Sequence, residues 1–86
     1  MDIHVFNLSQ NIIEHDLLKL FSTYGHVNSV VITRDKVNGR STGSAFVNMS
    51  NDDMARQAVL NLNQMLVDGK RIAVSEIKFS LGKYNN

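Results

Sequence analysis

The chain has 86 residues, 43% of them hydrophobic and 20% charged, with a formal net charge of +1. This length and composition are those of one small globular domain, and they exclude a disordered chain. The chain contains no cysteine, which excludes disulfides and cysteine-ligated zinc fingers, and no apolar run approaches the ~18 residues that a membrane-spanning helix needs.

The first half of the chain predicts a strand, a helix and a second strand. Residues 2–8 alternate between apolar and polar side chains, as a half-buried strand does. Residues 13–24 carry apolar side chains at helical spacing, and Gly25 follows them as a glycine after the end of a helix would. Residues 27–34 are rich in β-branched side chains and predict the second strand.

The second half predicts two more strands, a helix and a short turning segment. A loop over residues 35–43 leads into a strand over 44–49. A helix follows, with a polar cap over residues 50–53 and a buried stripe that runs from Met54 to Leu62. A segment over 65–70 turns at Asp68-Gly69, and the last strand spans 71–77. The order β-α-β-β-α-β is the split βαβ plan, in which two helices cover one face of a four-stranded antiparallel sheet and leave the other face to solvent. We therefore expect one α+β domain over residues 1–78 and a C-terminal tail over residues 79–86.

Two segments of the chain resemble the signature motifs of a known family. Residues 3–8, IHVFNL, resemble the first-strand hexamer of the RNA recognition motif, and residues 42–49, TGSAFVNM, resemble its third-strand octamer. The resemblance covers residues 2–77, nearly the whole chain. It implies the βαββαβ ferredoxin-like sandwich and RNA binding on the open face of the sheet. A chain that is one such motif and little else resembles the stand-alone bacterial members.

The side chains at the family's base-stacking positions depart from its usual pattern. The motif stacks two or three bases on aromatic rings, and the matching positions of this chain are His4, Ser44 and Phe46. Only Phe46 is a standard aromatic, although histidine can also stack. Thr42 stands where the octamer normally has lysine or arginine, which implies a missing phosphate contact. Phe6 stands where the hexamer more often has glycine or a polar residue.

Strand alternation places His4, Phe6 and Phe46 on the same face of the sheet. Single-stranded nucleic acid can stack on such a cluster because every base has a π-face. We therefore predict a non-enzymatic protein that holds single-stranded RNA on this face. The predicted RNA-binding residues are His4, Phe6, Thr42, Ser44, Phe46 and Asn48 on the face and the basic residues Arg34, Arg40 and Lys78 at its rim.

Three alternatives stay open at this point. Single-stranded DNA is one, because stacking ignores the 2′-hydroxyl that distinguishes RNA. A protein-interaction module is another, since Thr42, Ser44 and the low net charge suit a member of this fold that has lost its stacking aromatics. Such a module would bind a protein partner or form a homodimer through the sheet face. In the third alternative the tail covers the face, with Phe79 or Tyr84 seated against Phe6.

No sequence pattern of this chain is typical of an enzyme or a cofactor site. His4, His15 and His26 are spaced by eleven residues, which matches no metal-ligand spacing, and neither a phosphate-loop motif nor a nucleophilic cysteine occurs. Residues 1–25 lack the basic leader and apolar core of a secretion signal. We therefore expect no catalysis, no cofactor, no metal and no membrane contact, and we expect a cytoplasmic location.

Overall fold

The elements of the chain follow the predicted order, with a short hairpin before the last strand. The computed structural model describes residues 1–78. Its elements are β1 (Asp2–Phe6), α1 (Glu14–Ser22), β2 (Val27–Arg34), β3 (Ser41–Met49), α2 (Asp52–Leu62), β4 (Leu66–Val67), β5 (Lys70–Arg71) and β6 (Ala73–Glu76). The predicted tail over residues 79–86 lies outside this described part. Within residues 1–78, no helix is both long enough and apolar enough to cross a bilayer.

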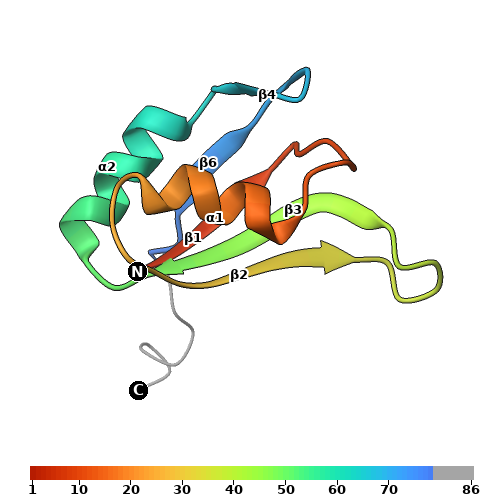
Figure 1. Ribbon diagram of the computed structural model, residues 1–86, viewed down its shortest axis with the longest axis horizontal. Coiled ribbons are helices and arrows are strands. Elements are labelled where there is room, and N and C mark those ends of the chain that lie inside the picture. Colours follow the sequence, from red (N-terminus) through yellow and green to blue (C-terminus); the bar gives the residue numbers. More distant parts are fainter. Residues whose placement is uncertain (79–86) are drawn as a thin grey trace.

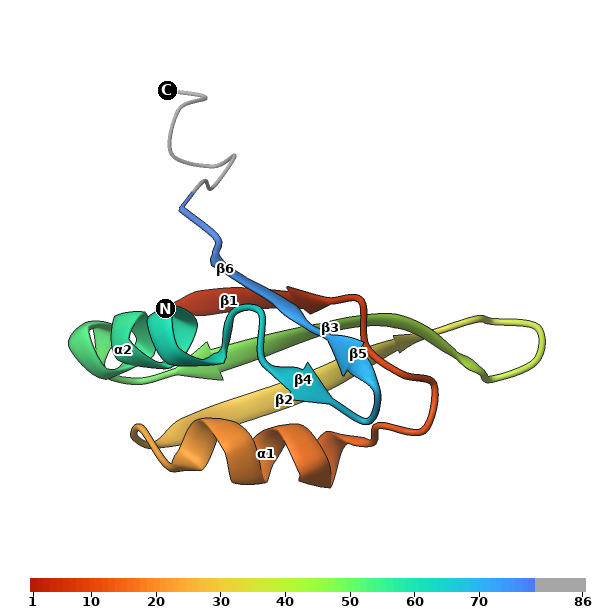
Figure 2. The same ribbon diagram turned by 90° about the horizontal axis from the view of Figure 1, so that it is seen from above.

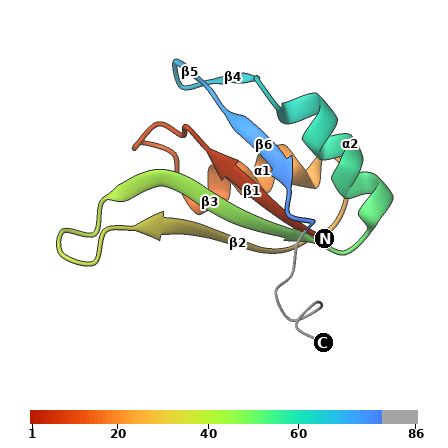
Figure 3. The same cartoon turned by 180° about the vertical axis from the view of Figure 1, so that it is seen from behind.

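Four strands form one antiparallel sheet in the order β2-β3-β1-β6, and β4 pairs with β5 in the separate hairpin. Figure 1 views the molecule from the side of the helices, and Figure 2 shows α1 running beneath the strands. Figure 3 shows the sheet from the face that the helices leave open. This arrangement confirms the predicted βαββαβ sandwich.

Alternation along the strands separates the core from the open face. Ile3 and Val5 of β1 and Ala45 and Val47 of β3 are fully buried, so the residues between them face outward. Each helix closes the core with one apolar stripe. The buried residues of these stripes are Leu17 and Phe21 of α1 and Ala55, Ala58 and Leu62 of α2.

A side-chain oxygen satisfies a backbone N–H at the start of each helix. Ile13 precedes α1, and its N–H donates to Asp16 Oδ2 at 2.9 Å. Asn51 precedes α2, and its Oδ1 accepts from the N–H of Met54 at 2.9 Å, as predicted for the polar segment there. These bonds fix where each helix begins and therefore which side chains it turns toward the sheet.

Gly25 does not have the role that the sequence predicts for it. A glycine after the end of a helix commonly takes a left-handed conformation, but the glycines with positive φ in residues 1–78 are Gly39, Gly43 and Gly69. A Cβ on Gly25 would lie 2.7 Å from Met54 Sδ, so this glycine makes room for that side chain instead. The prediction that Met54 is buried is also wrong, because it lies in the first turn of α2 and is 46% exposed.

The β4–β5 hairpin turns at Asp68 and Gly69, as predicted, and is tied to the segment between β1 and α1. The two turn residues have φ of 49° and 81°, values that suit a tight two-residue turn. The Asp68 carboxylate accepts hydrogen bonds from Ser9 Oγ at 2.5 Å and from Asn11 Nδ2 at 3.2 Å. These two bonds, the one from Ser9 first, hold the pKa of Asp68 below its ordinary value.

Candidate nucleic-acid interface

Three rings form a stacked group on the open face, here called the aromatic cluster: His4, Phe6 and Phe46. His4 of β1 lies opposite Phe46 of β3, and their ring centroids are 5.0 Å apart with planes 21° from parallel. The rings of His4 and Phe6 are 5.2 Å apart at 26°. The structure thus brings together the three side chains that strand alternation predicts for this face.

Ser44 restrains the imidazole at the centre of the aromatic cluster. Its Oγ lies 3.0 Å from His4 Nε2, within hydrogen-bond distance. Ser44 pairs with Phe6 across β3 and β1, so it lies on the same face as the rings. Where the family usually has a stacking aromatic, this chain therefore has a hydroxyl that orients a neighbouring ring.

The aromatic cluster is accessible to a planar ligand. Phe6 and Phe46 are each 45% exposed, and His4 is half-buried between them. Val31 of β2 lies opposite Phe46, is 56% exposed, and extends the apolar surface toward the edge of the sheet. The sequence prediction omits Val31, although its alternation with the buried Ile32 places it on this face. The apolar surface therefore crosses three neighbouring strands.

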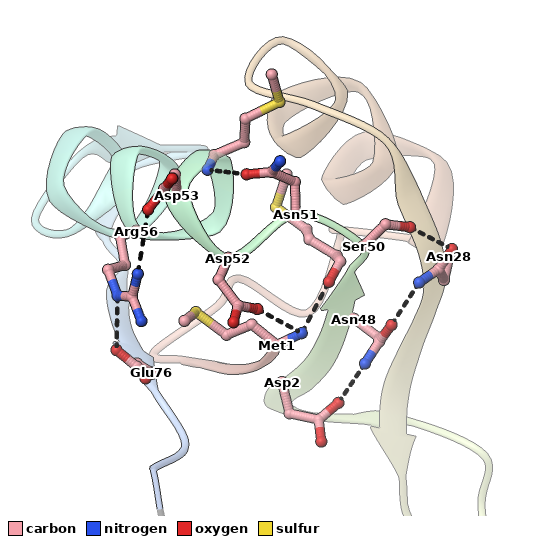
Figure 4. A network of polar contacts seen from close by, with 12 residues as sticks. Met1, Asp2, Asn28, Asn48, Ser50, Asn51, Asp52, Asp53, Arg56 and Glu76 are labelled. Carbon is pink, nitrogen blue, oxygen red and sulfur yellow. Dashed lines mark hydrogen bonds and ion pairs between the residues drawn. The ribbon is translucent and has the colours of Figure 1, made fainter.

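A ladder of side-chain hydrogen bonds crosses the face at the end nearest Met1 (Figure 4). Asn48 Nδ2 donates to Asp2 Oδ1 at 2.7 Å, and Asn48 Oδ1 accepts from Asn28 Nδ2 at 2.7 Å. Ser50 Oγ donates to Asn28 Oδ1 at 2.8 Å. We call Asp2, Asn28, Asn48 and Ser50 the polar ladder. Asn48, which the sequence predicts as an RNA contact, thus uses both atoms of its amide within the protein.

Arg34 lies on the side of the helices, contrary to its predicted position at the rim of the open face. A register shift between Ile32 and Arg34 places Arg34 opposite the buried Ser41, and Arg34 Nη2 lies 2.9 Å from Glu14 Oε1 at the start of α1. The backbone N–H of Glu14, and after it the Arg34 guanidinium, hold the pKa of the Glu14 carboxyl below its ordinary value. This ion pair joins β2 to α1.

The other predicted polar contacts lie beyond the aromatic cluster. Thr42 Oγ1 donates to the backbone oxygen of Thr33 at 3.1 Å. Arg40 is exposed where the β2–β3 loop closes, with its carbonyl accepting from the N–H of Asp35 at 2.8 Å. Lys78 is exposed after β6, at the end of the sheet that carries the polar ladder. Among residues 1–78, no three His, Asp or Glu side chains converge as a metal site would require.

Comparisons with known proteins agree on one family. The family model described as RNA recognition motif matches residues 3–73. The chain is 37% identical to Glycine-rich RNA-binding protein 1 of Mycosarcoma maydis over 73 residues, which are 85% of this chain and 42% of that protein. It is 43% identical to Transformer-2 protein homolog beta of Homo sapiens over 79 residues, which are 92% of this chain and 26% of that protein. The crystal structure of RNA Binding Protein PG1 superposes with a TM-score of 0.89 and 35% identity, over 93% of this chain and 96% of that one.

The chain spans less than half the length of each curated relative named above. The comparison therefore concerns one domain of each of these two proteins. Both are eukaryotic, so they do not support the likeness to stand-alone bacterial members, which stays a prediction.

Proposed function

This chain belongs to the RNA recognition motif family, and on that premise we propose that it binds single-stranded RNA on the open face of its sheet. The observation that carries the proposal is the aromatic cluster, whose three nearly parallel rings lie side by side with both phenylalanines exposed. Two similar proteins, Glycine-rich RNA-binding protein 1 and RNA Binding Protein PG1, are RNA-binding proteins by name, which supports the choice of ligand. The proposed role is binding without catalysis, in the cytoplasm.

Bases would stack on Phe46 and Phe6, with His4 between them. Base–aromatic stacking contributes ~1–3 kcal/mol per base. Two or three stacked bases together with a few phosphate contacts would then reach micromolar affinity, about −8 kcal/mol. A small number of phosphate contacts implies a shallow salt dependence, since each neutralised phosphate of a single strand adds about −0.7 to the slope of log affinity against log salt.

Truncation of Phe46 tests the proposal. We expect a pool of random single-stranded RNA heptamers at low salt to shift the backbone amides of β1 and β3 in a two-dimensional NMR titration of the full chain. Phe46→Ala should raise the Kd roughly five- to 150-fold, which corresponds to the loss of one stacked base.

Leu60→Ala is the matched control, because Leu60 is an apolar side chain of α2 that is 73% exposed and lies outside the sheet. An unchanged affinity in the Phe46 variant, or amide shifts confined to the helices, would contradict binding on this face. The same titration with DNA of identical sequence separates a ligand recognised through its 2′-hydroxyl from one recognised by stacking alone.

A second function is favoured by one observation, the continuity of the apolar surface over Val31, Phe46 and Phe6. Contiguous exposed apolar surface often marks association between proteins. The net charge of +1 means that two copies of the chain repel each other only weakly. On this alternative the face would pair with a protein partner or a second copy of the chain. Sedimentation at several concentrations discriminates the two functions, since a dimer that RNA does not dissociate would favour pairing.

A further inference from the structure

A hollow of about 710 Å³ opens beside Phe6, at the end of the open face opposite the polar ladder. We call it the basic hollow. It lies where β1 ends, β5 begins and β3 enters the sheet. The residues that matter for its chemistry are Phe6, Asn7, Thr42, Gln64, Lys70 and Arg71.

The side chains around the basic hollow suit an anion. Lys70 and Arg71 are both exposed and both line it, whereas no aspartate or glutamate of residues 1–78 does. The amides of Asn7 and Gln64 add neutral hydrogen-bonding groups. Because Phe6 forms one wall, an anion here would sit next to a ring on which a base can stack. Such a site suits a nucleotide, which carries a phosphate and a base on one sugar.

The walls of the basic hollow are held by bonds between distant segments. Asn7 Nδ2 donates to the backbone oxygen of Arg71 at 2.8 Å, and Arg71 Nη1 donates to the backbone oxygen of Gln64 at 3.2 Å. A guanidinium has five N–H donors, so the second bond leaves donors for a ligand. Asn7 and Gln64 have φ of 61° and 72°, and residues held in this sparsely populated region cluster at ligand sites.

The two ends of the open face therefore differ in charge. Asp2 lies at the start of β1 and Phe6 at its end, roughly 13 Å apart at the rise of an extended strand. The Asp2 end carries the polar ladder, whose amides already bond to one another and to a carboxylate. A phosphate at that end would meet the Asp2 carboxylate as well as the exposed Lys78, whereas no carboxylate of residues 1–78 lines the hollow that holds Lys70 and Arg71.

We propose that the basic hollow is a phosphate-binding subsite for the nucleotide that follows the one stacked on Phe6. A bound strand would then leave the aromatic cluster over β5 rather than over Asp2. This inference rests on the proposed function, because it requires single-stranded RNA on the cluster. It adds a contact for strands that are long enough to reach beyond Phe6.

The test compares two lengths of RNA and two pairs of substitutions. Random trimers and random heptamers are titrated against the full chain at several salt concentrations. For Lys70→Gln with Arg71→Gln, the heptamer salt slope should become shallower by about 0.7, the contribution of the one phosphate in the subsite, and the trimer slope should not change. Lys70→Gln alone should give about half of this effect, and it leaves the Arg71–Gln64 bond in place.

The control is Lys19→Gln with Arg56→Gln, which removes the same two charges from the two helices. Slopes that change equally in both double variants would overturn the subsite, because the loss would then be one of net charge. If wild-type protein binds neither trimer nor heptamer, the proposed function fails as well. If wild-type binds both and only Phe46→Ala weakens them, the proposed function stands and the subsite does not.

Discussion

His4 stands between two phenylalanines, and its orientation depends on one neighbour. An imidazole free to rotate would present its edge as often as its face to a base, whereas the bond to Ser44 restrains it within 21–26° of the planes of Phe46 and Phe6. The family pattern has a stacking ring at the position of Ser44. In this chain the serine hydroxyl contributes to stacking indirectly, because it orients the ring of His4. A smaller stacking surface that is already oriented loses less conformational entropy when RNA binds.

Ser44→Ala should weaken RNA binding without unfolding the protein. The expected rise in Kd is roughly two- to fivefold, the effect of one neutral hydrogen bond of ~0.5–1 kcal/mol, because the imidazole is no longer held. Fluorescence anisotropy with a labelled heptamer measures it. Ser75→Ala is the control, since Ser75 is exposed and lies opposite His4 on β6. Equal affinities of the two variants would show that the Ser44 bond does not orient the ring.

Positions on the open face could be predicted from the sequence where they depend on alternation alone. His4, Phe6 and Phe46 are of this kind, because His4 and Phe46 each lie between two buried residues of an extended strand and Phe6 follows the buried Val5. Alternation also places Asn48 on the open face and Arg34 on the face of the buried Ile32, but the partners that these two side chains bond lie 20 to 46 residues away in the chain and do not follow from alternation. The basic hollow is formed by segments that are far apart in the chain, so no local sequence pattern predicts it.

Elements were easier to predict than their ends, which local backbone conformation decides. β1 ends at Phe6, two residues before the predicted end, because Asn7 has φ of 61° and turns the chain. β3 begins at Ser41, within the predicted loop, and continues through Gly43, whose φ is 86°. A Cβ on Gly43 would lie 3.1 Å from the backbone oxygen of Leu8, so glycine permits this close approach of β3 to the segment that follows β1.

The β4–β5 hairpin should become less firmly attached as the pH falls. The pKa of Asp68 is lowered in the folded protein, so its carboxylate stabilises the fold above the ordinary value of 3.8 and loses this effect as the pH falls through the lowered pKa. Asp68→Asn should therefore unfold at a lower temperature than wild-type at about pH 6, and the difference should shrink toward zero below pH 3.8.

Thermal unfolding followed by circular dichroism across this pH range measures the difference for Asp68. The Glu14 carboxyl also has a lowered pKa and weakens both proteins in acid, but it is unchanged in the variant and cancels from the comparison. A difference in unfolding temperature that stays constant with pH would exclude the ionised Asp68 as the anchor.

At the scale of the whole molecule, one core carries nearly all of the apolar burial. The two helices and the inner face of the sheet meet in a single cluster of buried side chains, of which Phe21 is the largest. A domain of this size is stable by only ~5–15 kcal/mol, so the loss of one large core side chain is a substantial fraction of the total. The aromatic side chains of the open face lie outside this cluster of buried residues.

Phe21→Ala should destabilise the fold by ~3–5 kcal/mol, because it leaves a cavity where α1 meets the sheet. Urea unfolding at equilibrium measures the change. Leu18→Ala on the same helix should cost much less, since Leu18 is 39% exposed. A similar loss in both variants would mean that the core is not organised around Phe21.

The β2–β3 loop gives the protein a natural place for a chemical probe. Asp35 Oδ1 accepts from the N–H groups of Val37 and Asn38, so the loop keeps its shape through bonds within itself. Val37 at its tip is 95% exposed, and the chain has no cysteine. A Val37→Cys substitution would therefore create a single thiol for a fluorophore or spin label, attached outside both the core and the aromatic cluster.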